Sequence, residues 1–331
     1  MNSKIKKLAL LSLFFFTYDS KGAIDLRESS FTHSATEFSL LTRHYHSRSN
    51  RPGLVGYGWC FAFEAQIIRL NERQWRVYEC GSQSEITDFV PAPDQSGVWF
   101  NPSQPDDRLI VGLKEISRPL RSQVFFRKNG NLKSFATASG ATVTLVYGSE
   151  NQIIELRASD GRSIRLQWNP HSQFIERAVT AEGEAVSYLY ENQNLIAVKK
   201  GSETLWRYAY DDFHNLTEVH QGKRVIAALK YDTANDRVIE YQNENGCRER
   251  YSYKEIRGTG EETFIADIER SCRQRENSKT RFKFFYLELN SLQRSLAQMT
   301  IETEKEKTII SFDRKTGHTL SVEKLKNLRR L

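Results

Sequence analysis

An aromatic doublet, a polar turn and an aliphatic run follow one another in "YAYDDFHNLTEV", residues 208–219. The same order occurs in "YLYENQNLIAV", residues 188–198. Seven aromatic residues lie 20 to 22 residues apart: Phe126, Tyr147, Trp168, Tyr190, Tyr210, Tyr231 and Tyr253. Glycines precede the last six of them by seven or nine residues: Gly140, Gly161, Gly183, Gly201, Gly222 and Gly246. A nearly constant period predicts a repeat architecture.

Each repeat unit is predicted to form two short strands and two turns. Val143, Leu145 and Tyr147 alternate with other residues, which is the pattern of a half-buried strand. Asn, Asp and Gly in the turns supply the positive φ that tight reversals need. The returning stretch "QFIERAV", residues 173–179, does not keep one parity, so we expect a β-bulge there.

A single unit is too small to fold alone. Ordering its backbone and side chains costs on the order of 30 kcal/mol, whereas one buried aromatic residue with its aliphatic neighbours returns about 10 kcal/mol. Neighbouring units must therefore pair edge to edge and bury one another's aromatic residues. The sequence predicts an all-β fold in which antiparallel hairpin repeats stack into a curved or spiral sheet.

Two motifs resemble the RHS/YD-repeat family. Tyr210-Asp211 and Tyr231-Asp232 keep the Tyr-Asp dipeptide of its repeats, and the other units are degenerate. Upstream, "LTRHYHSRSNRPGLVGYGWCFAFEAQIIRL", residues 41–70, is similar to the segment that precedes such repeats. The residues that carry this second match are Arg43, Tyr45, Ser47, Gly56, Tyr57, Gly58 and Trp59. The resemblance implies a short member with six or seven YD-like repeats and an exported, surface-associated habit.

The resemblance does not imply toxin activity. Large members of that family wind many hairpins into a hollow shell around a toxic polypeptide. Six or seven units are too few to close such a shell, and the Asp-Pro-x-Gly signature of its self-cleaving segment does not occur in this sequence. A shell fragment or accessory component of an RHS-type toxin-delivery system is therefore an alternative hypothesis.

The N-terminus has the layout of a secretory signal peptide, which we expect to span residues 1–22. Lys4, Lys6 and Lys7 precede an uncharged run at residues 8–18 that is too short to cross a bilayer. After it we expect an N-terminal RHS-like β domain at 23–123 and a YD-like array at 124–257. Degenerate hairpins and a basic tail are expected at 258–331. The mature protein would be periplasmic, on the cell surface or secreted, without a membrane span.

Four cysteines follow the predicted leader: Cys60, Cys80, Cys247 and Cys272. In an oxidising compartment an even number indicates disulfides, with three possible connectivities. Cys60 with Cys80 and Cys247 with Cys272 would close the shortest loops. A zinc site is the alternative, although no C-x-x-C spacing occurs.

The charge distribution does not indicate a nucleic-acid partner. The chain has a net charge of +7, but the leader holds four lysines and one aspartate, so about +4 remains. Its positive and negative residues alternate along the sequence. A glycan or another exported protein is the expected partner.

The sequence contains few signs of catalysis, and we expect a non-enzymatic protein without cofactor or metal. The motifs G-x-S-x-G, H-E-x-x-H and G-x-G-x-x-G do not occur. Asp106-Asp107 and Asp211-Asp212 are paired carboxylates, which leaves an envelope-polysaccharide hydrolase as a second alternative, although turn chemistry explains them more simply. His44 and His46 alternate on a predicted strand, where we expect solvent-facing positions and not a metal site.

Two features are candidates for binding. The repeat aromatics Tyr147, Trp168, Tyr190, Tyr210, Tyr231 and Tyr253 could stack on sugar rings, although the same residues are the expected core of the repeat. Residues 91–107, "PAPDQSGVWFNPSQPDD", are predicted to be the longest unpatterned loop, where a connector or a functional loop would lie.

Overall fold

The computed structural model describes residues 22–49, 51–80, 86–93, 95–102, 104–119, 124–137, 139–273, 275–290, 293–314 and 317–326. The predicted signal peptide and the predicted boundary at Gln123 lie outside these residues, except that Gly22 is described. The described structure is almost entirely β, as the repeat pattern predicts. Its helical structure is one short 3-10 turn, Ala62–Glu64, and none of the described residues forms a helix with the length and hydropathy of a membrane span.

The first part of the chain forms a small antiparallel sheet, which we call the N-terminal sheet. Its strand order is β1 (Ala23–Asp25), β2 (Ser30–Phe38), β3 (Leu41–His46) and β6 (Trp59–Phe61). A two-stranded ribbon, β4 (Pro52–Gly53) with β5 (Gly56–Tyr57), lies between β3 and β6 in the sequence. The motif residues of segment 41–70 thus lie on the N-terminal sheet and the loops that connect its strands.

All remaining strands form one antiparallel sheet of 24 strands in the described residues, and each strand pairs with the next in sequence. Its first half comprises β7 (Gln66–Asn71), β8 (Gln74–Tyr78), β9 (Ile86–Pro91), β10 (Val98–Asn101), β11 (Gln104–Val111), β12 (Glu115–Arg118), β13 (Val124–Arg127), β14 (Leu132–Ala136), β15 (Thr142–Tyr147), β16 (Ile153–Ala158), β17 (Ser163–Trp168) and β18 (Ile175–Thr180). Its second half comprises β19 (Ala185–Glu191), β20 (Asn194–Lys200), β21 (Glu203–Tyr210), β22 (Leu216–Gln221), β23 (Arg224–Asp232), β24 (Arg237–Asn243), β25 (Arg248–Arg257), β26 (Glu261–Cys272), β27 (Arg275–Asn290), β28 (Gln293–Thr303), β29 (Glu306–Phe312) and β30 (Thr319–Lys326).

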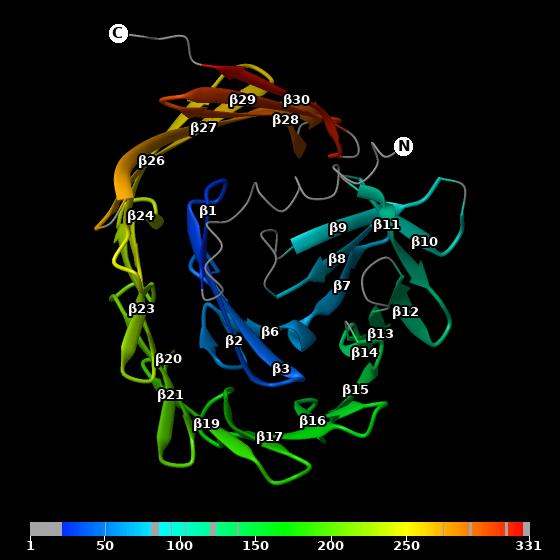
Figure 1. The fold of residues 1–331 in the computed structure, drawn as a ribbon. Coiled ribbons are helices and arrows are strands. Elements are labelled where there is room, and N and C mark those ends of the chain that lie inside the picture. Colours follow the sequence, from blue (N-terminus) through cyan, green and yellow to red (C-terminus); the bar gives the residue numbers. More distant parts are fainter. Residues whose placement is uncertain are drawn as a thin grey trace, which may run out of the picture.

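The large sheet curves around the N-terminal sheet (Figure 1). It is not closed into a barrel, so β7 and β30 are its two ends. β12 pairs with β13, so the sheet continues across the predicted boundary near Gln123. The division into domains at residues 123 and 257 stays a prediction.

The predicted repeats from Phe126 to Tyr231 are hairpins with a β-bulge beside the aromatic residue, whereas the strand of Tyr253 pairs with β26 without a register shift. The register shifts between Val146 and Tyr147 in one hairpin and between Gln167 and Trp168 in the next. The same shift occurs beside Tyr190, Tyr210 and Tyr231. Because a bulge increases local twist, these bulges contribute to the curvature of this part of the sheet.

The glycine of each repeat closes the other turn. Its φ is positive in every unit, from 59° at Gly201 to 93° at Gly161, and a Cβ there would meet no atom within 4 Å. Backbone conformation, and not lack of space, therefore explains why glycine recurs at this position.

Residues 91–107 do not form the unpatterned loop that the sequence indicated. They contain β10 and the start of β11, and Val98 pairs with Ile110 while Trp99 pairs with Leu109. The prolines and glycine that suggested a loop stand at the strand ends, where ladder hydrogen bonds are not needed.

Buried side chains form one main core between the two sheets and a smaller one in the last strands. The main core joins the N-terminal sheet to the inward-facing residues of β7 to β25. The smaller core contains Phe264, Ala266, Phe284, Met299 and Ile310, from β26 to β29.

Candidate functional site

The repeat aromatics lie in one row, and each is tied to the preceding hairpin. Their side chains donate hydrogen bonds to backbone carbonyls 15 residues earlier, at 2.6 to 3.1 Å. The pairs are Tyr147 to Leu132, Trp168 to Ile153, Tyr190 to Ile175, Tyr210 to Leu195, Tyr231 to Leu216 and Tyr253 to Val238. We call this row the aromatic ladder.

Each acceptor of the ladder lies at the bulge of its hairpin, directly before the residue that the bulge leaves unpaired. Ile153 pairs with Tyr147 across one hairpin, and its carbonyl accepts from Trp168 of the next. Burial raises the pKa of the Tyr147 hydroxyl to about 12 and that of the Tyr231 hydroxyl well above its usual value, so both remain protonated donors. The polar atom of each aromatic side chain in the ladder thus forms a hydrogen bond within the protein.

The same bulges hold the N-terminal sheet. The Ile175 amide donates to the Leu54 carbonyl at 2.8 Å, and the Val238 amide donates to the Ser29 carbonyl at 2.9 Å. Between them, the Leu216 amide donates to the Tyr45 hydroxyl at 2.9 Å. A bulge leaves backbone groups outside the strand ladder, and here the N-terminal sheet and the next aromatic residue satisfy them.

Arg43 lies at the centre of this contact and is fully buried. Its Nε donates to Glu37 at 2.7 Å and its Nη2 donates to the Tyr208 hydroxyl at 2.5 Å. Its guanidinium also lies over the Trp59 ring, 4.4 Å from the centroid. Burial lowers the pKa of Arg43, but the Glu37 carboxylate together with the Tyr208 and Tyr188 side chains raises it more, so the net shift is upward and Arg43 stays charged. Arg43, Tyr45 and Trp59 of the predicted motif therefore join the two sheets.

The structure contains two disulfides, Cys60–Cys80 and Cys247–Cys272, which is the pairing that closes the shortest loops. Cys60 lies in β6, so the first bond ties the N-terminal sheet to the segment after β8. The second joins the start of the β25 hairpin to the end of β26. Both bonds indicate an oxidising, exported environment.

The paired aspartates and the histidines have structural partners. Asp107 is buried and accepts two hydrogen bonds from Arg118, at 2.8 and 2.6 Å, while Asp211 accepts from the Phe213 and Asn215 amides in its turn. His44 bonds to Ser34 on the neighbouring strand at 2.8 Å. The described residues contain no group of three or more His, Cys, Asp or Glu side chains that could hold a metal ion.

His46 differs from the prediction that it faces solvent. It is 6% exposed, and its Nε2 lies 2.9 Å from Glu28 and 3.2 Å from Ser30. The alternation in "RHYHSR" indicated a strand correctly, but the coil of the large sheet covers both faces at this end of β3.

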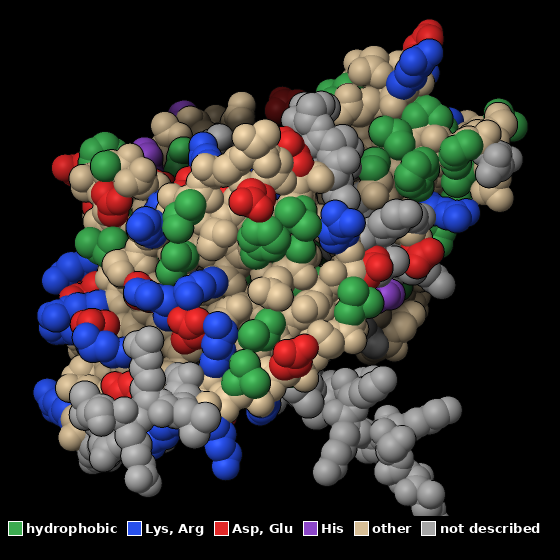
Figure 2. All heavy atoms as spheres, turned by 90° about the horizontal axis from the view of Figure 1, so that it is seen from above, with side chains coloured by type: hydrophobic (Ala, Val, Ile, Leu, Met, Phe, Trp, Pro, Cys, Tyr) green, Lys and Arg blue, Asp and Glu red, His purple; other side chains and the backbone are tan. Residues whose placement is uncertain are grey.

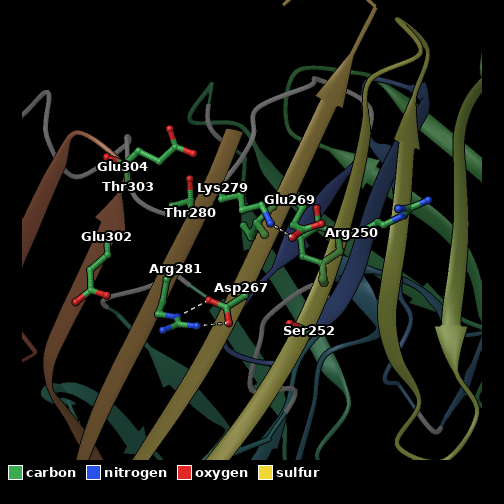
Figure 3. Close-up of a pocket in the computed structure, with 12 residues that line it drawn as sticks. Arg250, Ser252, Asp267, Glu269, Lys279, Thr280, Arg281, Glu302, Thr303 and Glu304 are labelled. Atoms are coloured by element: carbon green, nitrogen blue, oxygen red, sulfur yellow. Dashed lines mark hydrogen bonds and ion pairs between the residues drawn. The ribbon is translucent and has the colours of Figure 1, made fainter. Parts of the chain in front are cut away.

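One surface hollow of about 630 Å³ lies over the outer face of β25 to β28 (Figure 3). Charged side chains of opposite sign face one another across its strands. Arg281 donates to Asp267 at 2.6 and 2.9 Å, and Lys279 lies 2.6 Å from Glu269. Figure 2 shows positive and negative side chains interspersed on the face that it presents. The charges of this outer hollow are largely compensated by one another.

A second hollow of about 590 Å³ lies at the seam between the N-terminal sheet and the large sheet, and we call it the seam hollow. The N-terminal side contributes Arg27, Glu28, His46 and Arg48, which belong to the β1–β2 turn, β3 and the loop after β3. Its size falls within the range of about 300 to 1,000 Å³ that is usual for small-molecule sites.

The large sheet contributes both charged and aromatic residues to the seam hollow. Arg237 on β24 pairs with Glu255 on β25, and Arg294 on β28 pairs with Glu262 on β26. Phe264 and Tyr286 add ring surface between these pairs. None of these residues was predicted from the sequence, because the five strands that carry them meet only in the folded sheet.

Neither a protein-family model nor a curated protein sequence matches this chain. Among solved structures, the Tc holotoxin pore of Photorhabdus luminescens is similar at a TM-score of 0.22 and 8% sequence identity. The alignment covers 92% of this chain and 22% of that chain. Both values are too low to assign a family, so the relation to RHS/YD-repeat proteins stays a resemblance of sequence motifs.

Proposed function

We propose that this chain is an exported, non-enzymatic protein of the bacterial envelope or exterior that binds a glycan in the seam hollow. The observation that carries the proposal is the composition of that hollow: two Arg–Glu pairs stand beside the rings of Phe264 and Tyr286. Sugars present hydroxyl groups that both donate and accept hydrogen bonds, together with apolar C–H faces. Arginine donors, carboxylate acceptors and an aromatic ring complement those two kinds of surface.

The aromatic ladder is a weaker candidate for the same role. Its hydroxyls already donate to backbone carbonyls, and its rings pack against the main core. A sugar bound there would have to displace contacts that hold neighbouring hairpins together. Binding at the seam hollow requires no such loss.

The contacts of two candidate carboxylates, Asp107 and Asp211, support the non-enzymatic part of the proposal. Asp107 is neutralised by Arg118 in a buried pair, and both oxygens of Asp211 are used within its own turn. Neither group is available as a general acid or nucleophile. A shell fragment of a toxin-delivery system stays an alternative, but the N-terminal sheet already occupies the inside of the coil (Figure 1).

The test is calorimetric titration of the purified mature protein against a panel of neutral and acidic envelope oligosaccharides. We expect saturable binding that Tyr286→Ala weakens at least tenfold and that the ladder variant Tyr147→Phe leaves unchanged. No binding to any member of the panel, or loss of binding in Tyr147→Phe alone, would contradict the proposal. Release of new reducing ends from a polysaccharide would instead support the hydrolase alternative.

A further inference from the structure

The seam hollow has one cation without a carboxylate partner. Arg27 lies 3.5 Å from Asp25, and Arg237 and Arg294 are paired with Glu255 and Glu262. Arg48 pairs with no carboxylate among the described residues, and its one hydrogen bond there is a long one, 3.4 Å to the Asn235 carbonyl. Among the described residues, the lining of the hollow therefore has four arginines against three glutamates.

Two further polar atoms at this hollow have no hydrogen-bond partner. His46 is 94% buried and uses its Nε2 on Glu28 and Ser30, but its Nδ1 is unpaired. The Nε of Arg237 is also buried and unpaired. Buried polar atoms normally have a hydrogen-bond partner, because leaving one without a partner destabilises the fold. Both nitrogens are shielded from solvent, so the exposed Arg48 is the group of this hollow that a polar ligand reaches directly.

We propose that the seam hollow binds an oligosaccharide that contains a uronic acid, with Arg48 binding its carboxylate. This inference rests on the proposed glycan-binding function and adds the charge of the ligand. The planar guanidinium of arginine can bind a carboxylate through two parallel N–H donors. Hydroxyl groups of the sugar would lie beside the Glu28 and Arg294 side chains, and Tyr286 would lie against a ring face.

Charge separates acidic from neutral glycans at this site. Glu255 and Glu262 are each paired with an arginine, so they do not oppose a ligand carboxylate with a free negative charge, and Glu28 lies 2.9 Å from His46. A neutral sugar would leave Arg48 uncompensated, whereas one carboxylate in the ligand would balance it. The outer hollow has no equivalent, because Arg281 and Lys279 there already face Asp267 and Glu269.

The experiment compares galacturonate, glucuronate and mannuronate trisaccharides with their carboxyl-reduced counterparts of the same length. We expect the mature protein to bind at least one acidic trisaccharide at least tenfold more tightly than its reduced counterpart. Arg48→Gln removes this difference, Arg48→Lys restores part of it, and Arg250→Gln at the outer hollow leaves it unchanged. The Arg48 side chain is exposed and makes one long hydrogen bond, so the variants are expected to keep the wild-type melting temperature.

Each outcome separates this inference from the proposed function. Equal binding of acidic and reduced trisaccharides, with both weakened by Tyr286→Ala, would overturn the role of Arg48 and leave the glycan site in place. An acidic preference that survives Arg48→Gln would also overturn it. No binding of either kind of sugar, together with a negative glycan panel, would overturn both.

Discussion

The two parts of the large sheet are stabilised in different ways. From β13 to β24 the strands have four to nine residues, with a bulge in most hairpins and an aromatic ladder along the row. From β26 to β28 the strands have 12, 16 and 11 residues, and β25 pairs with β26 without a register shift. The first part packs on the N-terminal sheet, and the second largely on its own small core.

This difference explains the structural role of the aromatic ladder and the bulges. Short strands provide little paired backbone, so each hairpin of the first part depends on its neighbours through the ladder and on the N-terminal sheet through its bulges. Longer strands add paired backbone and buried area within each hairpin. Among the described residues of the last part of the sheet, no aromatic residue after Tyr253 forms a ladder hydrogen bond. We therefore expect the first part to be cooperative with the N-terminal sheet and the last part to be more independent.

The largest expected effect is that of Arg43→Ala. The change leaves the buried Glu37 without its partner, so we expect the free energy of unfolding to fall by about 3–5 kcal/mol. The matched change in the last strands, Arg281→Ala, breaks the exposed pair with Asp267 and should cost no more than about 1 kcal/mol. Chemical denaturation of both variants measures the contrast, and equal losses would remove the distinction between the two parts.

The stability of the N-terminal sheet should depend on pH through Glu64. Burial raises the pKa of its carboxyl from 4.5 to about 8, against the Phe61 and Leu54 amides that bond to it and lower it. A raised folded-state pKa means that the folded protein binds more protons than the unfolded chain between those values. This contribution is therefore complete below about pH 4.5 and is lost as the pH rises toward 8.

Glu64→Gln tests this dependence. We expect the slope of unfolding free energy with pH between about 4.5 and 8 to flatten in the variant, by up to about 1.4 kcal/mol per pH unit. Glu184→Gln is the control, because Glu184 forms an exposed pair with Lys200 and should leave the slope unchanged. An identical pH profile in wild type and Glu64→Gln would show that this carboxyl does not titrate in that range.

A smaller loss of stability is expected when a single hydroxyl of the aromatic ladder is removed. Tyr231→Phe removes the hydrogen bond to the Leu216 carbonyl while keeping the ring, so we expect a loss of about 1 kcal/mol. Tyr286→Phe in the last strands removes a hydroxyl that forms no hydrogen bond with another described residue and should change stability by about a few tenths of a kcal/mol. Thermal unfolding of the two variants checks this, and a null effect in Tyr231→Phe would mean that the ladder adds no stability.

The sequence predicted local structure well and long-range contacts poorly. The nearly constant spacing of the aromatic residues from Phe126 to Tyr253 was sufficient to predict the hairpins. The positions of the four cysteines suggested the disulfide pairing that the structure contains. It did not show that Tyr210 donates to Leu195, or that the N-terminal sheet lies inside the coil. Those contacts depend on how bulges bend the sheet, which no short window of sequence encodes.

The seam hollow was unpredictable for the same reason. Arg48, Arg237 and Tyr286 are far apart in the sequence, and each has an ordinary explanation as a solvated or cross-strand residue. Their relation appears only when the loop after β3 meets β24 and β27. Turn-forming residues misled the prediction for 91–107 because Pro and Gly at strand ends resemble those of a loop.

The most direct test of the account is amide hydrogen exchange at Leu216, which lies at the bulge of its hairpin. Its N–H donates to the Tyr45 hydroxyl, so this hydrogen bond joins the repeat directly to the N-terminal sheet. We predict that the Leu216 amide exchanges as slowly as the paired strand amides in the wild-type protein and much faster in Tyr45→Phe, while amides of β27 are unaffected. A Leu216 amide that exchanges like an open turn in the wild type, or that stays equally protected in Tyr45→Phe, would contradict the claim that the repeats are wound on the N-terminal sheet.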